Sequence, residues 1–201
     1  LRHRIGDQRV IRLIARMLKG GILEDGLVRA SEEGTPQGSI LSPLLSNIYL
    51  HYVLDLWFSR VVRPHCRGEA YYCRFADDFV ACFQYQQDAQ QFMDALSERL
   101  EQFRLSLAQE KTRCLEFGRF ARENARRRGE KPREFTFLGF THYCGKTKNG
   151  YFKVKRRTSR KKLGASLRAF ADWANRARRK LTKGEMLRRA KARVQGHLNY
   201  Y

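Results

Sequence analysis

Two short apolar runs enclose a pair of acids and limit how this chain can fold. Residues 71–75 and 79–83 are rich in aromatic and small apolar side chains, and Asp77 and Asp78 stand between them. Runs of this length and composition are typical of β-strands. Acids inside an apolar segment are best accommodated where the chain reverses, because their side chains then reach solvent or a ligand. The sequence therefore predicts a β-hairpin with Asp77 and Asp78 at its tip.

The acidic pair has two interpretations on these residues alone. A polar turn is the commoner meaning of two Asp residues between strands. Alternatively, adjacent carboxylates form a compact site for hard divalent cations, since Mg²⁺ prefers oxygen ligands. Two such ions about 3.5–4 Å apart can activate a hydroxyl group and stabilise a leaving oxygen in phosphoryl transfer.

Positive charge is confined to the second part of the chain. The 201 residues include 41 Lys and Arg against 20 Asp and Glu, a net charge of +21. Residues 1–118 hold 15 basic and 15 acidic side chains, whereas residues 119–201 hold 26 basic and 5 acidic side chains. Such a field attracts a polyanion, either lipid headgroups or nucleic acid. Aromatic side chains lie among the basic ones, which favours nucleic acid over lipid.

Several classes of protein are excluded by composition. No run approaches the ~18–20 apolar residues of a membrane span, so we expect no membrane partner. Five cysteines without a C-x-x-C pair argue against a disulfide framework and a four-ligand zinc site. Reduced, scattered cysteines suit the cytoplasm. Because the first residue is Leu1 and not Met, we expect the chain to be part of a longer protein.

Helical spacing of apolar residues predicts a mixed architecture. The expected helices are residues 7–19, a segment of about twenty residues that begins near residue 41, and residues 88–105. Two more are expected, one after Thr158 or Ser159 and one at the end of the chain. Ser42-Pro43 resembles a cap followed by Pro at the first helical position. We expect an α+β fold in which two long helices pack behind a small antiparallel sheet holding the acidic hairpin, followed by a basic helical extension.

Further strands are expected between these helices. The expected strands are one that ends at Phe117-Gly118 and a pair at 135–143 and 151–155, while 119–134 is expected to be a surface loop. Asn149-Gly150 between the last two is a strong hairpin signal.

Four blocks of sequence resemble the reverse transcriptases. They are the second palm block at 34–50, Phe75-Ala76-Asp77-Asp78, Glu110-Lys111-Thr112, and Phe137-Leu138-Gly139-Phe140. Phe75-Ala76-Asp77-Asp78 resembles the Tyr-x-Asp-Asp signature, with Phe75 in the tyrosine place, and Phe137-Leu138-Gly139-Phe140 resembles the primer grip. Order and spacing agree for all four. The tail from about Lys155 is similar to the maturase-specific thumb of group II intron-encoded proteins.

The resemblance implies a domain organisation and an activity. Residues 1–118 would form part of the palm, 119–157 a basic loop with the primer-grip-like hairpin, and 158–201 a helical thumb or maturase region. The implied activity is RNA-directed DNA synthesis of the group II intron type, with Mg²⁺ as cofactor. RNA template or intron RNA, DNA primer and dNTP would be the partners.

Individual roles follow from the same resemblance. Asp77 and Asp78 match the metal ligands, and Lys111 falls where a lysine lies near the departing pyrophosphate. The residues that would border the incoming nucleotide are Pro36, Gln37, Gly38 and Phe75, and Leu138 and Gly139 would contact the primer. Basic residues opening the thumb, expected along one side of a helix, would track the phosphates. They are Arg156, Arg157, Arg160, Lys161 and Lys162.

Two-metal chemistry in this family uses a third carboxylate, from a strand expected upstream of this chain. Asp7 and Asp55 are the nearby acids that could be considered for this third carboxylate, but both are expected on helices far from the hairpin tip. We therefore expect no activity from the isolated chain. Two alternatives stay open: a non-catalytic RNA-binding splicing factor, and a domesticated reverse transcriptase, for example a CRISPR-associated one.

Overall fold

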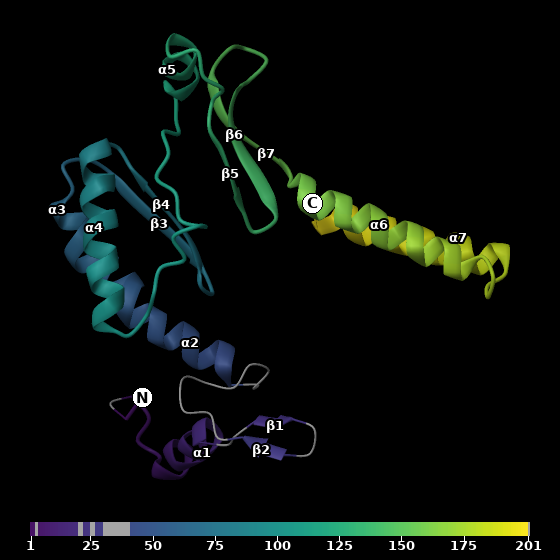
Figure 1. Cartoon of the computed structure of the whole chain (residues 1–201), viewed down its shortest axis with the longest axis horizontal. Helices are drawn as coiled ribbons and strands as arrows, with labels where there is room; N and C mark the ends of the chain where they lie inside the picture. The colour runs from purple at the N-terminus through teal and green to yellow at the C-terminus, as the bar shows by residue number, and fades with distance from the viewer. Residues whose placement is uncertain (3, 20–21, 25–26, 30–40, 201) are drawn as a thin grey trace. The chain divides into compact units, whose positions relative to one another are not determined.

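The chain divides into two compact units, which we call the N-terminal unit (Leu1–Leu107) and the C-terminal unit (Ala108–Tyr201). The computed structural model describes residues 1–2, 4–19, 22–24, 27–29 and 41–200 (Figure 1). The predicted nucleotide-binding residues Pro36, Gln37 and Gly38 lie outside the described residues.

The described part of the N-terminal unit contains a small hairpin, the hairpin that carries the acids, and three helical segments, the longest of which includes two π turns. Its elements are α1 (Gln8–Lys19), β1 (Ile22–Glu24), β2 (Leu27–Arg29), α2 (Ser42–Leu50), η1 (His51–Asp55), η2 (Phe58–Val62), α3 (Arg63–His65), β3 (Ala70–Phe75), β4 (Asp78–Phe83) and α4 (Gln86–Gln102). From α2 to α3 the chain is continuously helical, with two wide π turns at η1 and η2. We call this segment the long helix.

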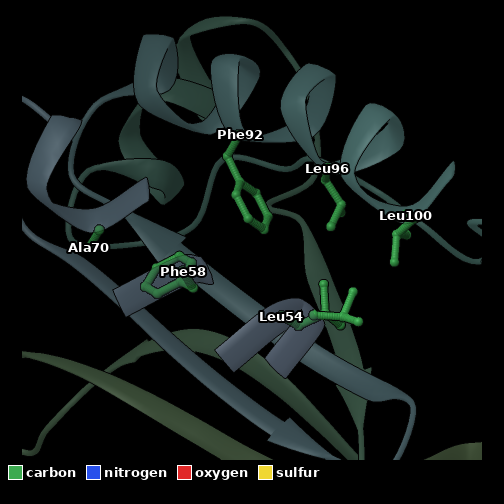
Figure 2. Close-up of a cluster of buried hydrophobic side chains, with 7 residues drawn as sticks. Leu54, Phe58, Ala70, Phe92, Leu96 and Leu100 are labelled. Atoms are coloured by element: carbon green, nitrogen blue, oxygen red, sulfur yellow. The ribbon is translucent and has the colours of Figure 1, made fainter. Parts of the chain in front are cut away.

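The core of the N-terminal unit lies between α4, the long helix and β3. Figure 2 shows Phe92, Leu96 and Leu100 pointing from α4 towards Leu54 and Phe58. The fully buried cluster consists of Val53, Leu54, Phe58, Ala70, Phe92, Leu96 and Leu100. Spacing of four residues along α4 places its three members on one helix face. This packing fixes β3 against the two helices, as the sequence predicts.

The C-terminal unit is built on a three-stranded antiparallel sheet. Its elements are α5 (Ala121–Arg127), β5 (Glu134–Phe137), β6 (Phe140–Lys146), β7 (Phe152–Thr158), α6 (Arg160–Ala177) and α7 (Lys183–Tyr200), and the strand order is β5-β6-β7. Asn149-Gly150 lies in the turn between β6 and β7, where Gly150 has a φ of 83°. Ser159 caps α6, because its side chain accepts a hydrogen bond from the Lys162 N–H. No described helix is long and apolar enough to cross a membrane.

The α+β class is confirmed as helices with small antiparallel sheets, and four local expectations are wrong. Leu41, not Ser42, occupies the cap position of α2. The residues before Phe117 are not in a strand, and α5 forms within the predicted loop, where two alanines are buried. The predicted strand 135–143 is two strands, because Leu138 and Gly139 have positive φ and reverse the chain.

Candidate functional site: an acidic turn

A two-residue turn joins β3 to β4 and carries the first acid. Phe75 pairs with Asp78 across the hairpin, which leaves Ala76 and Asp77 as the turn. Ala76 has a φ of 54°, in the left-handed region that residues with a Cβ atom rarely occupy. Such conformations persist only where the surroundings hold them, and they cluster at functional sites.

The hairpin buries one face and opens the other. Tyr72 points into the core, where its ring stacks on Phe58 with centroids 4.9 Å apart. Phe75, an odd number of positions further along the strand, points to the opposite face and is 64% exposed. Asp78 lies directly opposite Phe75 and therefore shares this open face. An acid and an aromatic ring are thus presented together to whatever binds there.

The two carboxylates are available as ligands. Asp77 and Asp78 are both exposed, and neither makes an ion pair or a side-chain hydrogen bond to another described residue. Hard oxygen donors without a protein cation are the donor set that Mg²⁺ prefers. Within the described ranges, no group of three or more His, Cys, Asp or Glu side chains is placed to hold a metal ion. Asp77 and Asp78 therefore provide two carboxylates of a candidate site.

Directly behind the turn, Arg74 ties the hairpin to the long helix. Its Nε and Nη2 atoms donate to the two carboxylate oxygens of Asp55, at 2.7 and 2.8 Å. Its Nη1 atom donates to Asn47 Oδ1 at 2.8 Å and to the Ala76 carbonyl at 2.7 Å. The hydrogen bonds between Arg74 and Asp55 lower the pKa of Asp55 and raise the pKa of Arg74. The expectation that Asp55 lies far from the hairpin tip is therefore wrong.

Sequence reasoning missed this arrangement, although one signal was present. Strand residues alternate between faces, so Arg74 falls on the same face as the core residue Tyr72. An arginine on a buried face needs an acidic or carbonyl partner, because an unpaired buried charge is costly. The alternation could have directed a search for an acid on the packed helix.

Lys111 lies in a hydrogen-bonded turn of the C-terminal unit. The N–H groups of Lys111 and Thr112 both donate to the Ala108 carbonyl, at 3.0 and 2.9 Å. The Lys111 side chain is exposed. Its role near the pyrophosphate stays a prediction, since it belongs to a different unit from the acidic turn.

The predicted primer-grip residues form a tight turn between β5 and β6. Leu138 and Gly139 have φ values of 49° and 84°. The Gly139 carbonyl accepts a hydrogen bond from the Ser159 N–H at 2.9 Å, so the turn is attached to the start of α6. A leucine in the left-handed region is strained, and this attachment holds it there.

The predicted phosphate-binding cations do not lie along one side of a helix. Arg156 and Arg157 are on β7, where neighbouring side chains point to opposite faces. Arg156 lies over the Phe140 ring, and Arg157 lies over Tyr143 and pairs with Glu134 at 2.8 Å. The other three cations form the first turn of α6, where all are exposed: Arg160, Lys161 and Lys162.

A basic hollow on the same sheet extends this surface. It is lined by His142, Tyr143, Lys153, Val154, Lys155 and Arg156, from β6 and β7. Gly145 has no side chain, and the stem of Lys155 lies over it: a Cβ atom there would come within 2.8 Å of Lys155. The sheet therefore presents cations and an aromatic ring side by side, a combination suited to phosphates and bases.

Comparison with known proteins places these features in a family. The model of the reverse transcriptase (RNA-dependent DNA polymerase) family matches residues 3–142. Protein YkfC of Escherichia coli (strain K12) is 39% identical over 105 residues, a match that covers 40% of this chain and 28% of YkfC. Group II intron-encoded protein LtrA of Lactococcus lactis subsp. cremoris is 52% identical over 57 residues, covering 26% of this chain and 10% of LtrA.

A third relative comes from a yeast. The uncharacterized 91 kDa protein in cob intron of Schizosaccharomyces pombe is 51% identical over 51 residues, covering 25% of this chain and 6% of that protein. The chain thus spans no more than 28% of the length of these relatives, and its similarity to group II intron-encoded proteins is partial. Because the family match extends over most of its residues, the chain belongs to the reverse transcriptase (RNA-dependent DNA polymerase) family.

Proposed function

We propose that this chain is the palm and thumb part of an RNA-directed DNA polymerase of the group II intron type. The single observation that carries the proposal is the acidic turn. Asp77 and Asp78 are exposed, no cation of the described residues pairs with either, and the other face of their hairpin packs against the core. Among members of a polymerase family, free carboxylates at that position are what a divalent cation requires.

The residues of the acidic turn have separate tasks in this proposal. Asp77 and Asp78 hold Mg²⁺, and Asp77 coordinates it directly. Held by these two carboxylates, Mg²⁺ would supply Lewis-acid chemistry that makes the primer 3′-hydroxyl more acidic and offsets charge on the leaving oxygens. The exposed ring of Phe75 packs under a sugar or a base pair beside the acids. A third carboxylate is expected from a strand outside this chain.

The remaining predicted residues surround the reactants. Pro36, Gln37 and Gly38 border the incoming dNTP, and Gln37 offers both donor and acceptor atoms to it. Lys111 neutralises charge on the departing pyrophosphate or gives it a proton. The Leu138-Gly139 turn contacts the DNA primer through its backbone, since a glycine allows close approach.

The C-terminal unit supplies the contact to RNA. Its 28 basic and 7 acidic side chains give it the entire net charge of +21. The cations of β7 and of the first turn of α6 bind the phosphates of template or intron RNA. The organisation into a palm at 1–118, a basic hairpin region at 119–157 and a thumb at 158–201 belongs to this proposal.

A splicing factor that only binds RNA is a weaker candidate, since it has no use for an exposed acidic pair. The test is primer extension by the whole protein that carries this chain, with an RNA template, a DNA primer, dNTP and Mg²⁺. Asp77→Asn should lower DNA synthesis by about 10³-fold, because loss of metal-borne charge stabilisation costs several kcal/mol. RNA affinity should stay within about twofold of that of the unaltered protein, since a phosphate-tracking surface is electrostatic and separate from the acids.

Asp94→Asn is the matched control. Asp94 is an exposed acid of the same unit that, among the described residues, accepts a side-chain hydrogen bond from Gln90 alone, at 3.1 Å, so its neutralisation should change neither quantity. If Asp77→Asn abolishes RNA binding together with synthesis, the acids support folding and the proposal is wrong. Primer extension by the isolated chain would contradict the expected need for an upstream carboxylate.

A further inference from the structure

We infer that Arg74 is a positioning residue that holds the acidic turn in its metal-binding form, with Asp55 as its counter-ion and Asn47 as its second anchor. The inference rests on the proposed function, since it concerns the same metal site. Neither Arg74 nor its two partners on the long helix is among the residues that the family resemblance assigns a role.

The contacts of Arg74 are too extensive for an ordinary surface ion pair. Its side chain is 9% exposed, and its guanidinium makes four hydrogen bonds of 2.7–2.8 Å. Both carboxylate oxygens of Asp55 are engaged, which is the bidentate geometry that fixes an arginine most firmly. Three of the four bonds therefore join β3 to the long helix, and the fourth joins it to the turn.

The fourth bond acts on the turn itself. Arg74 Nη1 donates to the carbonyl of Ala76, the group that begins the peptide linking Ala76 to Asp77. Fixing this carbonyl fixes the plane of the peptide, and with it the direction in which the Asp77 side chain leaves the backbone. Ala76 has a φ of 54°, a conformation that reverts unless a contact opposes it. Arg74 makes that contact.

Charge balance gives Asp55 its part. A guanidinium has five N–H donors, and four of the bonds they can make are formed here within the group of Asp55, Asn47 and Ala76. Asp55 also offsets the positive charge. Arg74 therefore does not pair with Asp77 or Asp78, although it precedes them by only three and four residues. Without Asp55, the guanidinium becomes a competitor of Mg²⁺ for those carboxylates.

A purely structural ion pair is the alternative, and the choice of variant separates the two. Arg74→Lys keeps the charge but cannot make the bidentate contact and reach the turn together. Arg99→Lys is the matched control. Arg99 is also a partly buried arginine of the N-terminal unit, where it donates to the Val53 carbonyl at 3.1 Å and lies over the Phe103 ring, but it does not contact the turn.

The experiment measures Mn²⁺ binding by electron paramagnetic resonance in the whole protein, alongside kcat, the KM for dNTP and thermal melting. Arg74→Lys should weaken Mn²⁺ binding and lower kcat by about tenfold each, with KM changed less than about threefold, because the turn and not the nucleotide site is altered. Arg99→Lys should change melting alone. Arg74→Lys protein that is folded and binds Mn²⁺ as the unaltered protein does would overturn the inference.

Asp55→Asn and Asn47→Ala keep the inference testable if Arg74→Lys does not fold. Asp55→Asn should weaken Mn²⁺ binding more than Asn47→Ala, since it also releases the guanidinium towards the acids. If the Asp55→Asn, Asn47→Ala and unaltered proteins bind Mn²⁺ with equal affinity, the role of Arg74 is overturned. The proposed function fails separately: in that case the unaltered protein binds no Mn²⁺, or binds it equally well after Asp77→Asn.

Discussion

The N-terminal unit encloses seven apolar side chains in one cluster, whereas the described side chains that the C-terminal unit buries are all small. The first unit carries as many acids as bases, and the second has a net charge of +21. One unit thus has the packing to hold a pair of acids and a strained turn in place. The other has little core to offset the repulsion among its cations.

This difference suggests how the two units respond to a partner. Apolar burial stabilises the N-terminal unit whether or not a ligand is present. In the C-terminal unit, a bound polyanion reduces the repulsion among the cations. Because it binds the folded unit, it also stabilises the folded state by mass action. We therefore expect ions and nucleic acid to affect the C-terminal unit strongly, and core substitutions to affect the N-terminal unit strongly.

The largest expected effect is that of salt on RNA binding by the chain. If six or more phosphates are contacted, RNA affinity should fall by about 10³-fold between 50 and 200 mM salt, because binding releases counterions. Replacing Arg160, Lys161 and Lys162 by alanine should reduce the slope of log affinity against log salt by roughly two. Filter binding across a salt series checks both. A flat response would remove the proposed distinction between the units.

The next effect tests the packed core. Leu96 is 0% exposed, and Leu96→Ala should lower the free energy of unfolding of the N-terminal unit by about 3 kcal/mol through lost burial and a residual cavity. Leu187, on α7, is 71% exposed, so Leu187→Ala should change stability by less than ~0.5 kcal/mol. Urea denaturation compares them. Equal losses would mean that the core does not lie where Figure 2 shows it.

A smaller effect concerns the local contacts of the C-terminal unit. Ser159→Ala removes the cap of α6 and should cost about 1 kcal/mol. Ser159→Asp keeps an acceptor and adds a negative charge among three cations at the helix start, so it should be at least as stable as the original. Thermal melting at low salt is the measurement. Loss of stability in both variants would show that the hydroxyl, not its acceptor role, matters.

The smallest effect is a pH dependence confined to acid. Arg74 holds the pKa of Asp55 below its ordinary value, and His51 Nδ1 lies 3.2 Å from the same carboxylate. A lowered folded-state pKa stabilises the fold above the unfolded-state value of about 3.9, and this contribution is lost as pH falls through the folded-state pKa. Urea midpoints between pH 2.5 and 6 should therefore vary less in Asp55→Asn. Parallel curves would contradict the pairing.

The acidic hairpin was predictable, and its support was not. Strand composition on both sides of Asp77 and Asp78 locates the turn, because a hairpin is determined by local sequence. The bond between Arg74 and Asp55 joins residues 19 positions apart on different elements, and no periodicity encodes such a pair. Only the packing of β3 against the long helix brings them together.

Other differences arise where tertiary contacts outweigh local preference. The segment 121–127 looks like a charged loop, but burial of Ala121 and Ala125 stabilises it as a helix. Leu138 adopts a positive φ that its side chain disfavours, because the register of β5 and β6 and the bond from Ser159 require the turn there. Composition alone gives no sign of either constraint.

The π turn at η1 determines whether Asn47 and Asp55 of the N-terminal unit can reach the same side chain. Asn47 and Asp55 are eight residues apart, whereas two turns of regular α-helix take about 7.2 residues. The π turn takes up the additional residue, so that the side chains of Asn47 and Asp55 lie on one face and both reach one guanidinium. With eight residues of regular winding and no wide turn, Asp55 would lie about 80° around the helix axis from Asn47, and its carboxylate would leave the arginine. Deleting one residue within His51–Asp55 should therefore be tolerated, because a spacing of seven residues in a regular helix keeps both side chains on one face.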